Sequence, residues 1–401
     1  MDPTRAVVVG GGIGGLAAAV ALRRRGWAVT VLERAPALTP VGAAISLTPN
    51  AQRALDVVGL GDPVRALSAW QGDGGMRTPG GRWLSRTNST AATERFGGPV
   101  VLLHRATLVD ILTSALPSDA VRTGVNGALA DPGGLDRAAV VSTPDGDIEA
   151  ALVVGADGVR SGVRGALFPG HPGPRYSGLT TWRVVVPSPD RPFAPHETWG
   201  RGALWGSQPL KDGRVYAYAM APAPEGERAP DGEKAELLRR FGDWHHPVPG
   251  IIAAAGPDGV LRNDVHHMPL PLPAYHAGRV ALLGDAAHAM LPTLGQGGNQ
   301  AVEDAIVLAH HAGSAGDGTD LVAGLATYTE ARLPRTTALV RQSARMGRIA
   351  SLRNPVALAA RNTLIAAVSL LGPGVLLRGF AEVADWRPPQ RPYAADKRSG
   401  A

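Results

Sequence analysis

The chain has 401 residues, of which 44% are hydrophobic, and its formal net charge is +6. This composition indicates a globular protein of two or three domains, and it excludes collagen-like, low-complexity and solenoid architectures. The absence of Cys excludes disulfides, thiolate metal sites and cysteine nucleophiles. The basic residues are mostly arginines scattered along the chain, whereas a nucleic-acid binder clusters them on one face, so we expect no nucleic-acid partner.

An apolar run near the N-terminus, Val7–Leu22, has the wrong charge order for a signal peptide. Asp2 precedes it and Arg23-Arg24-Arg25 follow it. The run is also too short and too rich in glycine to cross a membrane. We therefore expect a cytoplasmic protein without stable membrane insertion.

The same region predicts a βαβ unit. Ala6–Val9 is a short β-branched run typical of a buried parallel strand, Ile13–Arg25 is rich in Ala and Leu and indicates a helix, and Ala28–Leu32 is a second apolar strand.

A glycine fingerprint lies at the turn between this first strand and the helix. Gly10, Gly12 and Gly15 form G-x-G-x-x-G, which allows a tight turn and close approach of a pyrophosphate to the N-terminus of the helix. Glu33 ends the second strand, where a carboxylate accepts hydrogen bonds from both ribose hydroxyls. The motif predicts a dinucleotide site for FAD or NAD, because an acidic residue disfavours the phosphorylated ribose of NADP.

The central part of the chain alternates between short helices and strands, and then changes character. Helices are expected at 49–58 and 105–116, strands at 100–103 and 152–154, and a hairpin at 140–150. Between residues 176 and 268 three strand-like stretches, 180–186, 198–205 and 214–220, are separated by Pro and Gly. This pattern predicts a mainly antiparallel second domain.

The C-terminal third returns to the first pattern. It predicts a buried strand at 279–283, a helix at 299–311, a helix pair over 320–352 interrupted at Pro334, and a helix at 355–371 that Gly372-Pro373 ends. The last helix is apolar enough to suggest a peripheral membrane contact, although a packed C-terminal helix is the plainer interpretation.

Two further strands each end in an aspartate. Asp157 ends Leu152-Val-Val-Gly-Ala-Asp157-Gly158, and Asp285 ends Val280-Ala-Leu-Leu-Gly-Asp285. In an α/β sheet this edge binds ligands, so Asp285 is suited to hold sugar-type hydroxyls. The second motif continues through Pro292 to Gly295-Gln-Gly-Gly-Asn299, which begins a helix whose N-terminus suits an anionic ring system.

Together the three motifs resemble the flavoprotein monooxygenases of the para-hydroxybenzoate hydroxylase type, over roughly residues 5–345. The segments Val41–Leu47, His104-Arg105 and Tyr176–Arg183 are similar to those of salicylate-, 3-hydroxybenzoate- and urate-hydroxylase-like and zeaxanthin-epoxidase-like members. The resemblance implies an α/β fold: a Rossmann-like FAD-binding domain (GR2-type), an inserted mainly antiparallel β substrate domain, and a C-terminal helical segment.

We expect the FAD-binding domain to be discontinuous and to comprise residues 1–75, 98–175 and 269–345. The substrate-binding domain then takes residues 76–97 and 176–268, and residues 346–401 form the C-terminal helical segment and tail.

The resemblance implies roles for the motif residues around the adenosine and pyrophosphate of FAD. Glu33 would hold the ribose, Arg34 would flank the adenine, and Asp157 would support the pyrophosphate region and the docking of NAD(P)H. The residues that would hold the pyrophosphate itself are Gly10, Gly12, Ile13, Gly14 and Gly15.

Around the flavin, the resemblance implies that Arg105 would reach the phosphate or ribityl part and that Asp285 would hold the ribityl chain. Pro292 would lie over the ring on the side where oxygen reacts. The residues that would approach the isoalloxazine are Gly295, Gly297, Gly298 and Asn299.

The implied activity is that of an FAD-dependent monooxygenase that uses NADH or NADPH, as a transient co-substrate, and O2. It would hydroxylate a small aromatic or enolic molecule through a flavin C4a-hydroperoxide, which the protein must shield from water. The flavin carries the chemistry, so no catalytic side chain is assigned, and no His pair has the spacing of a metal site. An FAD-dependent epoxidase or oxidase of an apolar secondary metabolite, and a non-catalytic flavin-binding module, stay open as alternatives.

Strand alternation selects candidate substrate residues in the second domain. It places Trp199, Arg201 and Trp205 on one face, and Tyr216 and Tyr218 on another. If these faces cover the flavin, the pocket is aromatic and the Arg201 guanidinium pairs with a carboxylate or phenolate. Alternatively, this arginine faces solvent and the aromatic side chains form the core of the sheet.

One further position bears on the substrate. Urate-hydroxylating members have an Arg close to the position of Leu204, which disfavours urate as the substrate.

Overall fold

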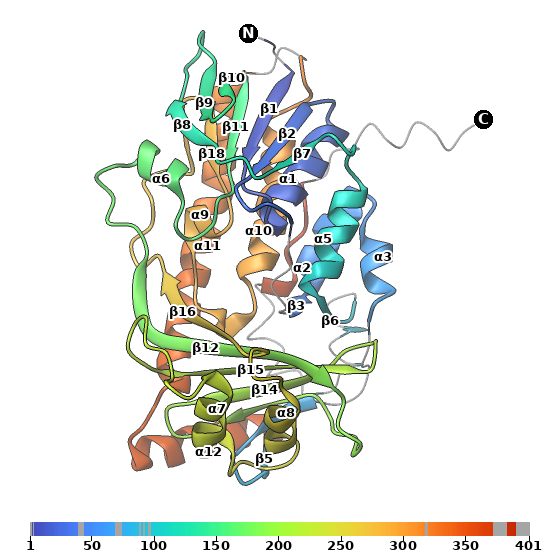
Figure 1. The fold of residues 1–401 in the computed structure, drawn as a ribbon, viewed down its shortest axis with the longest axis vertical. Helices are drawn as coiled ribbons and strands as arrows, with labels where there is room; N and C mark the ends of the chain where they lie inside the picture. The colour runs from blue at the N-terminus through green and yellow to red at the C-terminus, as the bar shows by residue number, and fades with distance from the viewer. Residues whose placement is uncertain are drawn as a thin grey trace, which may run out of the picture.

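The computed structural model describes residues 4–38, 44–68, 74–87, 98–316, 320–371 and 383–389, together with residues 2, 90, 93 and 94. Two sheets organise these residues, a mainly parallel one at the top of Figure 1 and a larger antiparallel one below it. Residues 41–43 of the Val41–Leu47 segment, and 372–382 and 390–401 of the predicted C-terminal segment, lie outside the described residues.

The upper sheet has six strands in the order β17-β18-β11-β1-β2-β7, and all its pairs are parallel except β17 with β18. Residues 6–9 of β1 are buried on both faces of the sheet, as expected for a parallel sheet covered on both sides. The predicted βαβ unit is confirmed. The strands are β1 (Arg5–Val9), β2 (Ala28–Glu33), β7 (Val121–Thr123), β11 (Leu152–Gly155), β17 (His276–Ala277) and β18 (Val280–Leu282).

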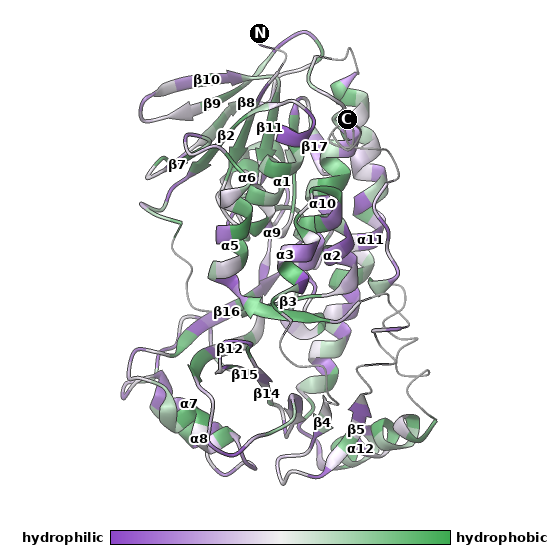
Figure 2. Ribbon diagram, turned by 90° about the vertical axis from the view of Figure 1, so that its right-hand side faces the viewer, coloured by the Kyte–Doolittle hydropathy of each residue, from purple (hydrophilic) through white to green (hydrophobic). Residues whose placement is uncertain are grey.

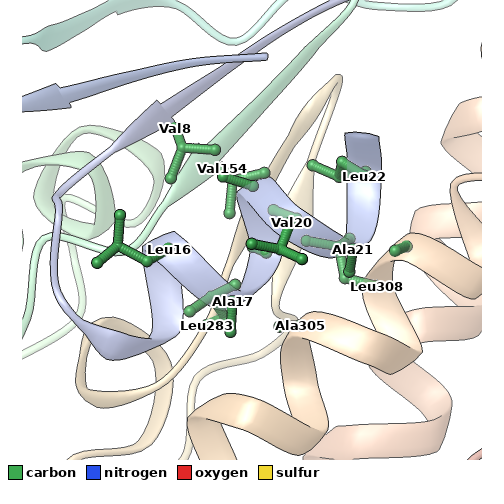
Figure 3. Close-up of a cluster of buried hydrophobic side chains, with 14 of the residues drawn as sticks. Val8, Leu16, Ala17, Val20, Ala21, Leu22, Val154, Leu283, Ala305 and Leu308 are labelled. Atoms are coloured by element: carbon green, nitrogen blue, oxygen red, sulfur yellow. The ribbon is translucent and has the colours of Figure 1, made fainter. Parts of the chain in front are cut away.

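Helices pack against this sheet in two layers. Helix α1 lies between the sheet and α10, and its small Ala17 and Ala21 let α10 approach at Ala305 (Figure 3). A Cβ on Gly14 would lie only 2.7 Å from Leu283 Cδ1, so this glycine also permits close packing. The helices here are α1 (Ile13–Arg24), α2 (Pro49–Val57), α3 (Gly61–Arg65), α5 (Arg105–Ser114), α6 (Gly162–Leu167), α9 (Asp285–His288), η1 (Pro292–Leu294), α10 (Gly297–His311) and α11 (Leu321–Ala350).

Two small antiparallel sheets flank the parallel one. The predicted hairpin forms as β9 (Ala139–Thr143) and β10 (Gly146–Ala150), which β8 (Ala128–Asp131) extends to three strands. The predicted strand at 100–103 forms as β6 (Val101–His104) and pairs with β3 (Ala44–Leu47) in a separate ribbon.

The lower sheet has seven strands in the order β16-β12-β15-β14-β13-β4-β5. Every pair is antiparallel except β13 with β4, as the sequence predicts for a mainly antiparallel domain. Residues 74–87 supply the last two strands at one end of this sheet, β4 and the edge strand β5, and the exact domain boundaries stay a prediction. The strands are β4 (Gly74–Arg77), β5 (Trp83–Thr87), β12 (Arg175–Pro187), β13 (His196–Trp199), β14 (Leu204–Pro209), β15 (Arg214–Pro222) and β16 (Leu261–His267).

The two faces of this sheet have different partners. One face packs against α7 (Glu233–Phe241) and α8 (Val248–Ala254), two helices that the sequence analysis did not predict. The other face turns toward the parallel sheet, where Leu204 and Met220 pack against Leu291 of the loop before η1. The second face is therefore the one that can meet a ligand held by the upper domain.

The predicted strand at 198–205 is wrong, and with it the shared face of Trp199, Arg201 and Trp205. The chain reverses between β13 and β14 in a turn where Gly200 N donates to Ala203 O at 2.8 Å. Arg201 lies in this turn, and its Nε donates to the Arg353 carbonyl at 2.9 Å. The alternation rule fails here because it requires a continuous strand.

Trp199 and Trp205 consequently belong to opposite faces. Trp199 is on the face toward the parallel sheet. Trp205 is buried beneath α7, with its ring 5.5 Å from that of Phe241, and its indole N–H donates to Ser207 Oγ at 2.9 Å. It is a core residue of the lower sheet.

Helix α11 corrects a second prediction, because it is one helix of 30 residues that continues through Pro334. Pro334 is exposed, so water can solvate the carbonyl that loses its N–H partner. Asp320 caps the helix by accepting from Ala323 N at 3.2 Å. The last described helix is α12 (Pro355–Leu370), close to the predicted range.

A buried charge network joins α10 to α11. Arg332 of α11 donates from Nε to Asp304 Oδ1 and from Nη1 to Glu303 Oε2, each at 2.6 Å, and all three side chains are at most 1% exposed. Asp304 Oδ2 also accepts from Gly284 N at 2.9 Å and contacts His288 Nε2 at 2.6 Å. Burial alone would raise the pKa of Asp304, but His288 and Arg332 hold this pKa below its usual value.

Replacing Trp205 with Phe tests whether this residue is core or substrate contact. We expect Trp205→Phe to lower the free energy of unfolding by about 1–2 kcal/mol, because it leaves a small cavity and removes the bond to Ser207. The affinity for aromatic ligands should stay unchanged. Chemical denaturation and ligand titration measure the two quantities, and a loss of ligand affinity without a loss of stability would contradict the assignment.

Replacing Arg332 tests the network. In Arg332→Met, Glu303 and Asp304 lose their central buried partner, and we expect the free energy of unfolding to fall by about 3–5 kcal/mol near neutral pH. The loss should shrink toward about pH 5, because a buried carboxylate that loses one of its cationic partners has a higher pKa and takes up a proton more readily. Arg345→Met, on the exposed side of the same helix, is the matched control and should change stability by at most about 0.5 kcal/mol. A pH-independent loss of less than 1 kcal/mol, roughly the value of a surface pair, would contradict this account.

Candidate cofactor and substrate site

A cleft of about 600 Å³ opens at the carboxyl ends of β1, β2 and β11. This edge is where a doubly wound sheet binds its ligand. The cleft brings together the glycine fingerprint with Glu33 and the motif that contains Asp157. The sequence-predicted residues that line it are Gly10, Gly12, Glu33, Arg34 and Asp157.

The glycines of the fingerprint divide into those that close the turn and one that keeps a space open. Gly10 has φ +111°, and a Cβ on it would overlap the Ala156 carbonyl. A Cβ on Gly15 would overlap the Gly10 carbonyl. A Cβ on Gly12 would meet no atom within 4 Å, so this position borders open space in the cleft. A cradle of this kind fits a pyrophosphate, which approaches the backbone at the second glycine.

Glu33 lies at the edge of the cleft in a fixed orientation. Its Oε2 accepts from Gly11 N at 2.7 Å and its Oε1 from Ala35 N at 2.8 Å. The carboxylate thus joins the glycine turn to the end of β2. Each oxygen keeps a further lone pair for a ligand hydroxyl.

Asp157 has a clear structural role that the sequence analysis missed. Its Oδ1 accepts from Ser161 Oγ at 2.5 Å and its Oδ2 from Val163 N at 3.1 Å, while the Ser161 hydroxyl caps α6 by accepting from Arg164 N. The aspartate therefore shapes the wall of the cleft by fixing the start of α6. The short Asp157–Ser161 spacing was the signal for this cap.

The third motif lies toward the lower sheet. Asp285 follows Gly284, whose φ is +58°, and its carboxylate is exposed without a hydrogen-bond partner among the described residues. Arg105, at the start of α5, is likewise unpaired there. Burial and the Arg183 charge lower the pKa of Arg105, and the Asp285 charge opposes them, so these three groups lie near one another. Arg105 is exposed to solvent although protein surrounds it. We call the space that Arg105, Arg183 and Asp285 border the recess.

The loop after Asp285 presents the N-terminus of α10 to the same recess. Pro292 begins the short η1 turn, and Gly295 has φ +62°. Among the described residues no side chain caps α10, so its first N–H groups stay available to an anion. A Cβ on Gly297 would lie 3.9 Å from Asp285 Oδ1, whereas one on Gly298 would come within 2.5 Å of Ile45 Cδ1.

Asn299 is bound within the protein rather than open to the recess. Its Oδ1 accepts from Thr48 N at 2.9 Å, and its Nδ2 donates to Ser46 O at 2.8 Å and to Gly295 O at 2.7 Å. The side chain fixes β3 beside α10. The family resemblance implies that this residue approaches the isoalloxazine, and only its backbone could do so, because the side chain is bonded within the protein.

On the lower sheet, the face toward the recess carries a hydrogen-bonded group of Tyr218, Glu197 and Trp199 among apolar side chains. The Tyr218 hydroxyl donates to Glu197 Oε1, and the Trp199 indole N–H donates to Glu197 Oε2 at 2.9 Å. Burial and the Glu197 charge raise the pKa of Tyr218 well above its usual value near 10, so its hydroxyl stays neutral. Apolar side chains surround the group on the same face, namely Leu179, Leu204, Met220, Val265 and Leu291.

Tyr216 is on the same face as Tyr218, with ring centroids 5.6 Å apart. Burial raises the pKa of Tyr216, and the nearby Arg183 opposes this shift. The structure thus brings Trp199, Tyr216 and Tyr218 together and leaves Arg201 and Trp205 elsewhere. Glu197 and Arg183 are the residues on this face that the substrate prediction missed, because their proximity depends on strand pairing.

Comparisons with known proteins agree with this arrangement. Residues 3–343 match a family model described as FAD binding domain. The chain is 39% identical over 368 residues to the aurachin C monooxygenase/isomerase of Stigmatella aurantiaca, covering 90% of this chain and 94% of that protein. It is 33% identical over 355 residues to 3-hydroxybenzoate 6-hydroxylase 1 of Aquipseudomonas alcaligenes, covering 82% and 85%.

A solved structure, HpxO of Klebsiella pneumoniae complexed with FAD and uric acid, has the same fold. It superposes with a TM-score of 0.85 at 28% identity, over 95% of this chain and 96% of that one. The fold and the cofactor implied by the sequence resemblance are confirmed. The chain therefore belongs to the FAD binding domain family, and it is an FAD- and NAD(P)H-dependent monooxygenase of the aromatic-hydroxylase type.

Proposed function

We propose that the cleft and the recess together hold one extended FAD molecule. The adenosine would lie beside Glu33 and Arg34, the pyrophosphate over Gly12, and the ribityl chain between Arg105 and Asp285. The observation that carries this proposal is the open space at Gly12, whereas a Cβ on Gly10 or Gly15 would overlap backbone. The unpaired charges of Arg105 and Asp285 support the path toward α10.

The isoalloxazine would then lie at the N-terminus of α10, between η1 and the lower sheet. Bound flavin supplies the reaction with electrons from NAD(P)H and with activation of O2. The protein's part is to orient the ring with backbone N–H groups and to keep water out. Leu204, Met220 and Leu291 supply that apolar enclosure.

We propose that the substrate is an aromatic compound with an apolar body that donates an O–H or N–H hydrogen bond to Tyr218. The Tyr218 hydroxyl already donates to Glu197, so toward a substrate its oxygen can act only as an acceptor, a role in which it also meets the Gln208 side chain. The Glu197 carboxylate repels a substrate carboxylate at this end of the site. The apolar side chains around Leu204 match a large ring better than a urate-like one.

The relatives support a substrate of this class. The protein that is 39% identical is named for aurachin C, whereas the relatives named for 3-amino-4-hydroxybenzoate, for 3-hydroxybenzoate and for urate are 37%, 33% and 33% identical. An epoxidase activity is the second candidate, because the chain is also 33% identical to a zeaxanthin epoxidase of Solanum lycopersicum, over 52% of that protein. We further propose that the enzyme works in the cytoplasm, where NAD(P)H is regenerated.

The position of the pyrophosphate is tested at Gly12. Gly12 caps the start of α1 with φ −73°, and a new Cβ meets no atom of the described residues within 4 Å, so Gly12→Ala should leave the stability of the cofactor-free protein unchanged. We expect the Kd for FAD to rise about tenfold or more, because the methyl group takes the space of a phosphate oxygen. Quenching of FAD fluorescence measures the affinity.

Gly15→Ala is the matched control for this experiment. Its Cβ would overlap the Gly10 carbonyl, so it should lower the melting temperature even without FAD. If Gly12→Ala binds FAD as tightly as the unmodified protein, the pyrophosphate does not cross this glycine.

The substrate class is tested with Tyr218→Phe and pairs of ligands that differ by one methyl group. For phenols or N–H heteroaromatics, removal of the acceptor should weaken binding about fivefold, or about 1 kcal/mol. For the O-methyl or N-methyl analogues the variant should bind like the unmodified enzyme, because no donor is lost. Perturbation of the flavin absorption spectrum reports each Kd.

The raised pKa of Tyr218 adds a condition to the same titrations. Its ionisation lies above pH 10, so between about pH 6 and 9 the Kd should follow only the ionisation of the ligand. Equal weakening for the donor ligand and its methylated analogue would mean that Tyr218 acts only through packing. Tight binding of aromatic carboxylates would contradict the role given to Glu197.

A further inference from the structure

Helix α12 presents an apolar outer face. Val356 is 77% exposed, Leu364 65% and Leu370 88%, and Leu371 just after the helix is 69% exposed. These four residues, which we call the apolar stripe, recur at spacings that place them on one side of the helix. Over its 16 residues the helix contains no Asp, Glu or Lys, and its single Arg361 is buried.

The opposite side of α12 fixes the helix to the protein. Arg361 donates from Nη1 to Ile349 O at 3.3 Å, at the end of α11. Ile365 and Met346 pack against the core cluster that contains Trp199, on the face of the lower sheet that turns toward the parallel sheet. Figure 2 shows α12 as a mainly hydrophobic helix at the lower edge of the molecule. The apolar stripe is therefore held outward by anchored contacts on the inner side.

Exposed arginines lead into this helix. Arg341, Arg345 and Arg348 follow the solvent side of the last turns of α11, and Arg353 lies in the link to α12. None of these four, which we call the arginine group, forms an ion pair in the part of the chain that the structure describes. The sequence from 331 to 381 contains no Asp or Glu at all. The arginine group and the apolar stripe thus lie at the same end of the molecule.

We propose that the apolar stripe and the arginine group dock the enzyme on an anionic phospholipid surface. A helix with an apolar face and neighbouring arginines inserts that face shallowly at the boundary of headgroups and acyl chains. The arginines then pair with lipid phosphates and with the negative potential of the surface. The contact is peripheral, since among the described residues no helix is long and apolar enough to cross a membrane.

The charge pattern favours a lipid surface over a second copy of the chain. Two copies that joined through α12 would bring two arginine groups together without a carboxylate from residues 331–381 to separate them. An anionic bilayer supplies the apolar layer and the negative charge in the same place. A docked enzyme would also take an apolar substrate directly from the bilayer, although the docking does not depend on the proposed substrate.

The test is sedimentation of the FAD-loaded full chain with extruded vesicles. Vesicles of phosphatidylcholine alone are compared with vesicles that also contain phosphatidylglycerol. We expect binding to the anionic vesicles and little to the neutral ones. Binding should weaken when salt rises from about 0.05 M to about 0.5 M, because salt screens the arginine contribution.

Two variants separate the apolar and the charged parts. Leu364→Glu should reduce vesicle binding at least tenfold, and Arg345→Glu with Arg348→Glu should reduce it about fivefold for each arginine. The matched controls are Leu135→Glu, whose leucine is 66% exposed on the parallel-sheet domain, and Arg191→Glu with Arg228→Glu. FAD content, melting temperature and NAD(P)H oxidation in vesicle-free buffer should be unchanged in every variant, which shows that the fold and the active site are intact.

Three results would overturn the proposal. The first is failure of the unmodified protein to sediment with anionic vesicles. The second is equal loss of binding in the Leu364→Glu variant and the Leu135→Glu control. The third is a dimer in size-exclusion chromatography that Leu364→Glu converts to monomer, because that would assign the stripe to a second copy.

Discussion

The buried ion pairs of Arg332 with Glu303 and Asp304 are the constraint on which the site depends. A guanidinium and two carboxylates without access to water are stable only while all are paired, so α10 and α11 must keep their register. The network reaches further than these two helices. Asp304 fixes the backbone of Gly284, and the Glu303 carboxylate accepts from Asn50 Nδ2 of α2 at 2.6 Å.

Three segments around the predicted flavin position, at Gly284, Ser46 and Thr48, are tied to this network or to α10. The bond from Gly284 sets the direction in which the next residue, Asp285, points. Asn299 holds β3, and Gln296 bonds to Thr48 Oγ1 at 3.1 Å. The recess therefore keeps its shape through side chains that do not themselves face a ligand. This arrangement is the support that precise cofactor placement requires.

Local patterns in the sequence predicted the parts of the fold whose partners are close in the chain. The βαβ unit, its glycine turn and the strand that ends in Asp157 follow from periodicity and spacing alone. The turn at Gly200 interrupts the strand predicted at 198–205, because a run of Trp, Gly and Ala is compatible with either a strand or a turn. Arg201 and Trp205 were misplaced for this reason.

The missed residues have partners that are distant in sequence. Arg332 lies 28 residues from Asp304, and on the sequence it is indistinguishable from the exposed arginines of the same helix. Tyr218 meets Glu197 only because β15, β14 and β13 are neighbours in the sheet. Strand order and helix register supply these contacts, and neither has a local signal.

A rigid cofactor cradle faces a substrate side that is apolar around one neutral tyrosine. With this arrangement the chain inserts one oxygen atom of O2 into an aromatic substrate. The most direct measurement is mass spectrometry of the product formed by FAD-loaded enzyme with NADH or NADPH under heavy-isotope O2. The account predicts a product that contains one labelled oxygen atom. NAD(P)H oxidation that yields labelled hydrogen peroxide and no labelled product, across the phenols and N–H heteroaromatics that bind, would contradict it.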